Sequence, residues 1–214
     1  MKGLLTKDLC LLMQRKRIFI IILVFGAAIS FSTEPAFFIG WLVMIGMLFS
    51  ISTIAYDEYD NSMPFLLTLP ISRKVYALEK YAFSFLCALA CWLTGILLFL
   101  INSICRGTAA NWGSQILQLM IILFAGMILF DLCIPFNLKF GPEKGRIYML
   151  ILWGAAFALI SIILSKTGND SGTFENYTGP AVLPALTGII IVLAVIATAV
   201  SAMISIRIME KKEY

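Results

Sequence analysis

The chemistry that this 214-residue chain could perform alone is narrow, because its sequence lacks several reactive groups. It contains no histidine, so neither a serine-histidine protease nor an HExxH metalloprotease can be assembled. Cys87 and Cys91 share a helix face, but without histidine or a further ligand cluster they do not predict a metal site. The run GPEKGR at 141–146 lacks the GxxxxGK(S/T) spacing of a phosphate-binding loop. We therefore predict no enzymatic function for the chain itself.

Asp131 is the only acidic residue well inside an apolar run, and carboxylates within a membrane are costly enough to imply a use. It lies about one turn from Pro135, near the end of its run. This position favours an interfacial or helix-packing role over a proton relay, and both remain open. Asn102, near the other end of a run, fits a helix end or an interhelical hydrogen bond.

The segment 56–80, YDEYDNSMPFLLTLPISRKVYALEK, begins acidic, ends basic and contains two prolines. Ser62 supplies helix-capping chemistry, Pro64 is tolerated in a first helical turn, and Pro70 ends the helix. We expect a short helix of about two turns, held between two membrane helices. Its apolar side chains need a partner or the lipid surface; they are Phe65, Leu66, Leu67 and Leu69.

The composition requires a membrane around these residues, since 61% of the chain is hydrophobic and only 13% is charged. A spanning helix needs about 20 apolar residues, and lipid-exposed backbone must satisfy its own hydrogen bonds. We predict an all-α polytopic membrane protein with six transmembrane helices. The apolar runs are 18–32, 36–55, 81–104, 116–134, 147–165 and 181–206. The first two are expected to form a tight hairpin.

Lysine and arginine gather on one side of this arrangement, which by the positive-inside rule is the cytoplasmic side. With both termini cytoplasmic, the outer side keeps only Arg106 and Lys166. The inner side holds Lys2, Lys7, Arg15, Lys16, Arg17, Arg73, Lys74, Lys80, Lys139, Lys144, Arg146, Arg207, Lys211 and Lys212. The segments 56–80 and 135–146 are therefore predicted to be cytoplasmic, and the basic balance indicates topology, with no nucleic acid as partner.

Residues 1–17 are predicted to form an amphipathic helix on the inner leaflet, before a transmembrane domain at 18–206 and a tail at 207–214. Leu5, Leu9, Leu12 and Met13 fall on one helical face, opposite Lys7 and Gln14. A signal peptide and a solvated, frayed N-terminus are the alternatives.

Two segments resemble a known family. LLTLPISRKVYALEKY, preceded by YDEYD, is similar to the segment between the second and third spans of type-2 ABC transporter permeases. PFNLKFGPEKGR at 135–146 is similar to a second cytoplasmic loop in the small bacterial branch of that family. With six spans, the resemblance covers essentially the whole chain and implies a multi-pass protein of the bacterial cytoplasmic membrane.

The resemblance implies a permease subunit without its own cofactor, paired with a second permease copy or a related permease. Two separate cytoplasmic ATPase subunits would bind ATP and Mg²⁺ and dock on a coupling helix in the 56–80 loop. Acidic side chains would contact basic residues of the ATPase, and the apolar face would fill its groove. The implied coupling residues are Asp57, Glu58, Asp60, Ser62, Met63, Pro64, Phe65, Leu66, Leu67, Leu69 and Arg73. The second cytoplasmic loop contributes Lys139, Gly141, Glu143, Lys144 and Arg146.

Relatives in the small branch resemble exporters of amphipathic peptides, including phenol-soluble modulins and antimicrobial peptides. The resemblance therefore implies export of an amphipathic or hydrophobic substrate such as a peptide toxin. Two other classes stay open: an ion-coupled secondary transporter that uses Asp131, and a membrane scaffold that docks partners and transports nothing.

Overall fold

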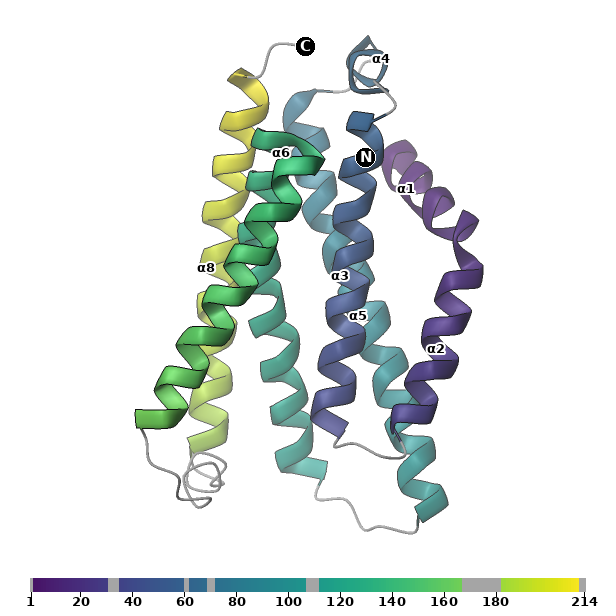
Figure 1. Ribbon diagram of the computed structural model, residues 1–214, viewed down its shortest axis with the longest axis vertical. Coiled ribbons are helices and arrows are strands. Elements are labelled where there is room, and N and C mark those ends of the chain that lie inside the picture. The colour runs from purple at the N-terminus through teal and green to yellow at the C-terminus, as the bar shows by residue number, and fades with distance from the viewer. Residues whose placement is uncertain are drawn as a thin grey trace.

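The computed structural model describes residues 2–30, 35–59, 62–68, 72–106, 112–166 and 182–211, and these ranges contain helices and no strand. The helices are α1 (Lys2–Gln14), α2 (Lys16–Ser30), α3 (Pro35–Tyr59), α4 (Ser62–Thr68), α5 (Arg73–Arg106), α6 (Trp112–Lys166) and α8 (Val182–Lys211). In Figure 1 the long helices run along the long axis of the molecule, with α4 at one end. The prediction of an all-α fold is confirmed for the described residues.

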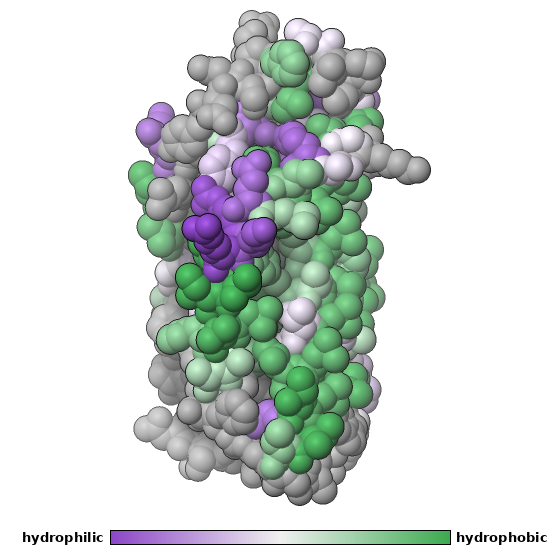
Figure 2. Space-filling model, turned by 90° about the vertical axis from the view of Figure 1, so that its right-hand side faces the viewer, coloured by the Kyte–Doolittle hydropathy of each residue, from purple (hydrophilic) through white to green (hydrophobic). Residues whose placement is uncertain are grey.

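Four helices are long and apolar enough to cross a membrane, judged by length and composition within the described residues. Their candidate spans are Phe37–Glu58, Arg73–Cys105, Gln115–Gly141 and Leu183–Lys211. Figure 2 shows the face formed by α1 and α2, where hydrophilic surface lies above a broad hydrophobic surface. A hydrophobic surface of this kind is what a lipid-facing protein exposes. The chain is a multi-pass membrane protein; the expected six spans and cytoplasmic termini stay predictions.

The helix α6 contains one residue with non-helical backbone, Gly141, at φ 77° and ψ 174°. Figure 1 shows two legs of α6 that meet in a sharp turn near the α4 end of the molecule. The sequence had suggested a loop over 135–146, whereas the structure keeps helix up to Gly141 and again after it. Glycine permits this turn because a positive φ with an extended ψ is almost closed to other residues.

The turn in α6 also depends on a second glycine. A Cβ placed on Gly145 would lie 2.3 Å from the Asn137 side-chain oxygen and 3.2 Å from the Asn137 Cα. The Asn137 amide in turn donates a hydrogen bond of 2.9 Å to the Cys133 carbonyl. The two legs can therefore approach this closely only because position 145 carries no side chain.

The central core forms where α3 packs between α5 and α6. It includes Phe38, Ile39, Val43 and Met47 of α3, each at most 1% exposed. A Cβ on Gly46 would lie 3.0 Å from the backbone oxygen of Cys87 on α5, so a small residue sets this helix separation. Close approach at small residues is the usual way in which membrane helices gain packing contacts.

A second buried group, which we call the end cluster, gathers residues of α1, α3, α4, α5, α6 and α8 beside α4. Its members are Leu4, Ile54, Met63, Tyr76, Ala77, Tyr81, Ile134, Leu138 and Met209. Six helices thus converge at the end of the bundle that carries α4, which we call the α4 end.

Candidate functional site

The helix α4 presents two different faces. Met63 is 3% exposed and belongs to the end cluster, while Phe65 is 68% exposed. Leu66 is partly buried and packs against the same cluster. The Thr68 hydroxyl donates a hydrogen bond of 2.7 Å to the Phe65 carbonyl, which satisfies one acceptor of the last turn. The helix is therefore fixed through Met63 and Leu66 and offers Phe65 outward.

The start of α5 fixes the chain on the other side of α4. The Ser72 hydroxyl accepts a hydrogen bond of 3.3 Å from the Val75 backbone amide, as a helix N-cap does. Arg73 donates to the carbonyls of Met209 and Glu210, at 3.3 and 3.0 Å. A cation at these last carbonyls of α8 satisfies free acceptors and suits the negative end of the helix dipole. Arg73 thus ties the connection after α4 to α8.

The end of α3 meets the turn of α6. A Cβ on Gly141 would lie 3.2 Å from the Glu58 carboxylate oxygen, so the turn backbone runs close to this side chain. Glu58 was implied as an ATPase contact and Gly141 as part of a separate loop. The structure brings the two together, so the segments before α4 and within α6 form one surface region.

Asp57 has partners within the chain. It is 3% exposed and forms ion pairs with Lys7 of α1 and, at 3.0 Å, with Lys80 of α5. The Tyr76 hydroxyl donates a further hydrogen bond of 3.0 Å to Asp57. Its implied contact with the ATPase stays untested, but its carboxylate already has these internal partners.

Lys80 lies at the centre of what we call the buried charge network: Lys7, Asp8, Asp57, Glu79 and Lys80, with Thr53 and Tyr76. The Lys80 amine is 1% exposed and lies 2.5 Å from an Asp8 carboxylate oxygen and 3.2 Å from the Thr53 hydroxyl. It also lies 5.1 Å from the centre of the Tyr76 ring. The network therefore joins α1 to α3 and α5 through charge-assisted hydrogen bonds in a buried setting.

Glu79 is the least satisfied member of the network. Its side chain is 0% exposed, and its closest cation, the Lys80 amine, is 3.9 Å away. Within the described residues neither carboxylate oxygen of Glu79 has a hydrogen-bond partner. If all five groups are ionised, three carboxylates face two amines, so the network carries one excess negative charge.

This network is not among the features predicted from the sequence, which place Lys7 on the polar face of the first helix and give Asp8 no role. The available signal was spacing, because Leu4 and Asp8, Thr53 and Asp57, and Tyr76 and Lys80 are each four residues apart on one helix. Each pair therefore shares one helix face, and each of these residues is buried in the structure.

Asp131 lies between α6 and α8. Its carboxylate accepts a hydrogen bond of 2.6 Å from the Thr198 hydroxyl, and its backbone carbonyl accepts one from Ser201. The Tyr81 hydroxyl lies 2.6 Å from Ser201 and 2.7 Å from Ser205. Asp131 thus takes part in interhelical hydrogen bonding, which is the packing role that its position favoured; the proton-relay alternative is not tested.

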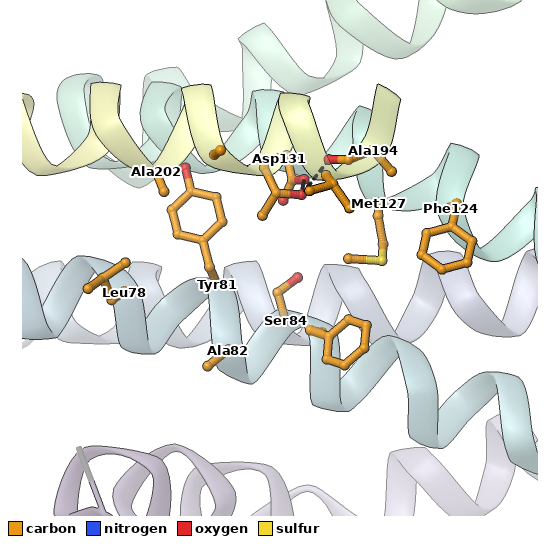
Figure 3. A pocket seen from close by; sticks show the side chains of 13 residues that line it. Leu78, Tyr81, Ala82, Ser84, Phe124, Met127, Asp131, Ala194 and Ala202 are labelled. Atoms are coloured by element: carbon orange, nitrogen blue, oxygen red, sulfur yellow. Dashed lines mark hydrogen bonds between the residues drawn. The ribbon is translucent and has the colours of Figure 1, made fainter. Parts of the chain in front are cut away.

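A pocket of about 590 Å³ lies between α5, α6 and α8 beside Asp131. Figure 3 shows Asp131, Tyr81 and Ser84 directed toward the same space, among apolar neighbours such as Met127 and Phe124. Apolar walls with a few convergent polar groups are typical of ligand sites. The described residues contain no group of histidine, cysteine and acidic side chains able to hold a metal ion.

The remaining predicted residues divide between described and undescribed positions. Lys139, Glu143 and Lys144 are exposed around the α6 turn, where the rings of Phe136, Phe140 and Tyr148 pack against one another. Ser62, Pro64 and Leu67 lie in α4, and Arg146 lies in α6. For these four residues the structure describes the backbone and not the side chain. Asp60 and Leu69 lie outside the described residues.

Comparison with known proteins gives a family match. The model of the ABC-2 family transporter protein matches residues 3–210. No curated protein and no solved structure matches the chain. The family match extends over nearly the whole chain and overlaps every helix described above; the chain belongs to the ABC-2 transporter family and is a membrane subunit of the permease type.

Proposed function

We propose that this chain is the permease subunit of an ATP-driven exporter and that α4 is the helix on which a separate ATPase docks. The single observation that carries the proposal is the pairing of Met63, buried in the end cluster, with Phe65, 68% exposed on the same short helix. A helix fixed on one side with a large apolar side chain on the other suits insertion into an apolar groove. ATP and Mg²⁺ belong to the ATPase in this proposal.

The helix α4 and the chain on either side of it are in contact with the membrane domain at three places. Met63 packs in the end cluster, and Arg73 donates hydrogen bonds to the end of α8. Asp57 and Lys80 form ion pairs with α1 within the buried charge network. Because these contacts join six helices at one end, a displacement of α4 is passed on as rigid-body movement rather than absorbed locally. A second copy, or a related permease, would supply the other wall of the path.

The proposed topology has six crossings with both termini in the cytoplasm. Four are the candidate spans, and α2 and the second leg of α6, residues 142–166, supply the other two. The lysine and arginine distribution supports the orientation. A bacterial cytoplasmic membrane is the proposed location.

The proposed substrate is amphipathic or hydrophobic, and the resemblance favours peptides such as toxins or antimicrobial peptides. The pocket beside Asp131 supports this class, because apolar side chains surround the polar groups of Asp131, Thr198 and Tyr81. Such walls suit a molecule with one apolar and one polar face better than a free ion or a sugar.

The decisive experiment is purification of the tagged chain from its native membrane in mild detergent, with mass spectrometry of bound proteins. We expect an ATPase with a Walker motif, and we expect Phe65→Arg to release it because the variant would bury a charge in the groove. Phe65 is the better position than Leu66, since Leu66 packs against the end cluster and its replacement would disturb the fold. Cys10→Arg is the matched control, adding the same charge at an exposed site of α1.

The outcomes separate the possibilities. Retention of the ATPase and of stimulated ATP hydrolysis by Phe65→Arg would show that docking does not use α4. Recovery of the unchanged chain without any ATPase, under several gentle conditions, would remove the exporter proposal. An ATPase that binds but is never stimulated by peptides would point to a scaffold.

One observation supports a second candidate function, an ion-coupled secondary transporter. Asp131 is 5% exposed within a candidate span and lines the pocket between α5, α6 and α8. A carboxylate in this position could bind and release an ion. This alternative requires transport without an ATPase and its loss in Asp131→Asn.

A further inference from the structure

A second hollow of the molecule lies on the side of α1 and α2. This groove has a volume of about 690 Å³ and is lined by α1, α2, α3 and α5. Leu9 and Met13 of α1, Phe19 of α2 and Leu86 of α5 are among its apolar walls. Only Thr6, Lys16 and Thr94 add polar side chains other than cysteine. The groove is thus a largely apolar channel with a lysine at its edge.

Three cations lie at the corner where α1 ends and α2 begins. Arg15, Lys16 and Arg17 are exposed, and among the described residues none of them forms an ion pair. The Arg15 guanidinium lies 4.7 Å from the centre of the Tyr56 ring, which attaches the corner to α3. The backbone amides of Arg15 and Ile18 are hydrogen-bonded within the corner, at 2.9 Å each. The three cations therefore project from a hydrogen-bonded stretch of backbone and have no acidic partner among the described residues.

We propose that this groove binds a phospholipid with an anionic headgroup, with an acyl chain in the groove and the headgroup at Lys16 and Arg17. The argument is complementarity: an apolar channel open to the lipid and unpaired cations at its edge match the two parts of such a molecule. A zwitterionic lipid offers the same chain but no net charge, so it gains less from the cations. The groove is distinct from the Asp131 pocket, and the proposal does not depend on transport.

The lipid would have a structural effect, because it fills the space between α1 and α5. The helix α1 reaches the rest of the bundle at its Leu4 and Asp8 face, while Leu9 and Met13 remain more than half exposed. A bound acyl chain covers those two side chains and closes the gap beside α5. Binding is therefore expected to stabilise α1 in its observed place.

The test is native mass spectrometry of the purified full chain, with phosphatidylglycerol or phosphatidylcholine added at equal concentrations. Wild type should bind phosphatidylglycerol more tightly. Lys16→Gln/Arg17→Gln should weaken the binding of phosphatidylglycerol about thirtyfold, the value for two cations near an anionic surface, and should leave the binding of phosphatidylcholine unchanged. The control Lys139→Gln/Lys144→Gln removes the same charge from exposed positions of α6 and should bind phosphatidylglycerol as wild type does.

A second pair of variants tests the groove itself. Ala90 is exposed and lines the groove, so Ala90→Phe fills it and should reduce binding of both lipids. Ala185→Phe adds the same ring at an exposed position of α8 and should bind lipid normally. The proposal is overturned if both lipids bind to the wild type with equal affinity. It is also overturned if the two double variants lose the same affinity for phosphatidylglycerol, or if Ala90→Phe and Ala185→Phe bind lipid equally well.

Discussion

Replacing Lys80 by methionine tests whether the buried charge network holds α1 against α3 and α5. Methionine is similar in length to lysine and removes the amine while keeping an apolar stem. The amine lies 2.5 Å from Asp8, 3.0 Å from Asp57 and 3.2 Å from Thr53, at 1% exposure. Its removal leaves Asp8 with a hydrogen bond of 3.1 Å from the Thr53 hydroxyl and with one cation, Lys7, 3.4 Å away, which is also the partner of Asp57.

The expected magnitude follows from this burial. Removing one partner of a buried pair costs about 3–5 kcal/mol, because the other charge stays buried without compensation. For a chain of about this size, each kcal/mol shifts the thermal midpoint by roughly 2–4 °C, so Lys80→Met should lower it by about 6–20 °C. Lys74→Met is the matched control on the same helix: Lys74 is 64% exposed and pairs with Glu210 at 3.2 Å. An exposed pair contributes about 0–1 kcal/mol, so this control should shift the midpoint by less than about 4 °C.

The assay is tryptophan fluorescence of the purified protein on heating, in one detergent and at one heating rate, since apparent midpoints depend on that rate. The double variant Asp8→Asn/Lys80→Met should be more stable than Lys80→Met alone, because it removes the carboxylate that lost its partner. Equal shifts in Lys80→Met and Lys74→Met would refute the network as drawn. A double variant no more stable than Lys80→Met would refute Asp8 as the uncompensated charge.

Three further predictions use the same measurement or a transport assay. Gly141→Ala should cost about 1–3 kcal/mol, because alanine is strained at φ 77° and its Cβ would meet Glu58; Gly154→Ala, where a Cβ meets nothing within 4 Å, should not destabilise. Glu79→Gln should not lower the midpoint, because its carboxylate makes no hydrogen bond within the described residues and lies 3.9 Å from the Lys80 amine, whereas Asp57→Asn should lower it; equal losses would show that the long Glu79–Lys80 ion pair stabilises the fold as much as the Asp57 pairs do. Asp131→Asn should retain the acceptor for Thr198 and should retain ATP-driven transport, whereas abolished transport would favour ion coupling.

The apolar runs predicted the long helices well because membrane insertion is decided by composition, which one sequence displays. They predicted the helix ends less well. The third apolar run covers 81–104, whereas α5 begins at Arg73, eight residues earlier. That start is indicated by Ser72, a capping residue that predicts a helix running through Tyr76 into the third span, and Ser72 is observed as the N-cap of α5. The first two turns of α5 contain Glu79 and Lys80, whose charges argue against an apolar run but are buried among other helices. The expected loop at 135–146 differs for a related reason, since one glycine is enough to reverse the direction of α6.

The candidate site could be predicted only where a single segment carries the signal. The short helix between Ser62 and Pro70 was readable from its capping residue and prolines, and α4 is observed at Ser62–Thr68. The partners of Asp57 could not be read in this way, because Lys7 and Lys80 lie 50 and 23 residues away in the sequence. Which helix faces meet is decided by three-dimensional packing, and an isolated charge near a span end looks the same whether it faces water or another helix.

The position of Asp57 changes what a partner could recognise at the α4 end. An acidic run before an apolar helix suggests ion pairs with a basic partner, yet Asp57 is engaged by Lys7, Lys80 and Tyr76, and Glu58 lies against the α6 turn. Among the described residues of this run and α4, Phe65 is then the most prominent apolar group available for contact. Asp57 and Glu58 contact other helices of the same chain, and these contacts fix the end of α3 and the start of α5 on either side of α4. Recognition through an apolar side chain and rigidity through buried charges are therefore separate properties of neighbouring residues, and each can be changed without the other.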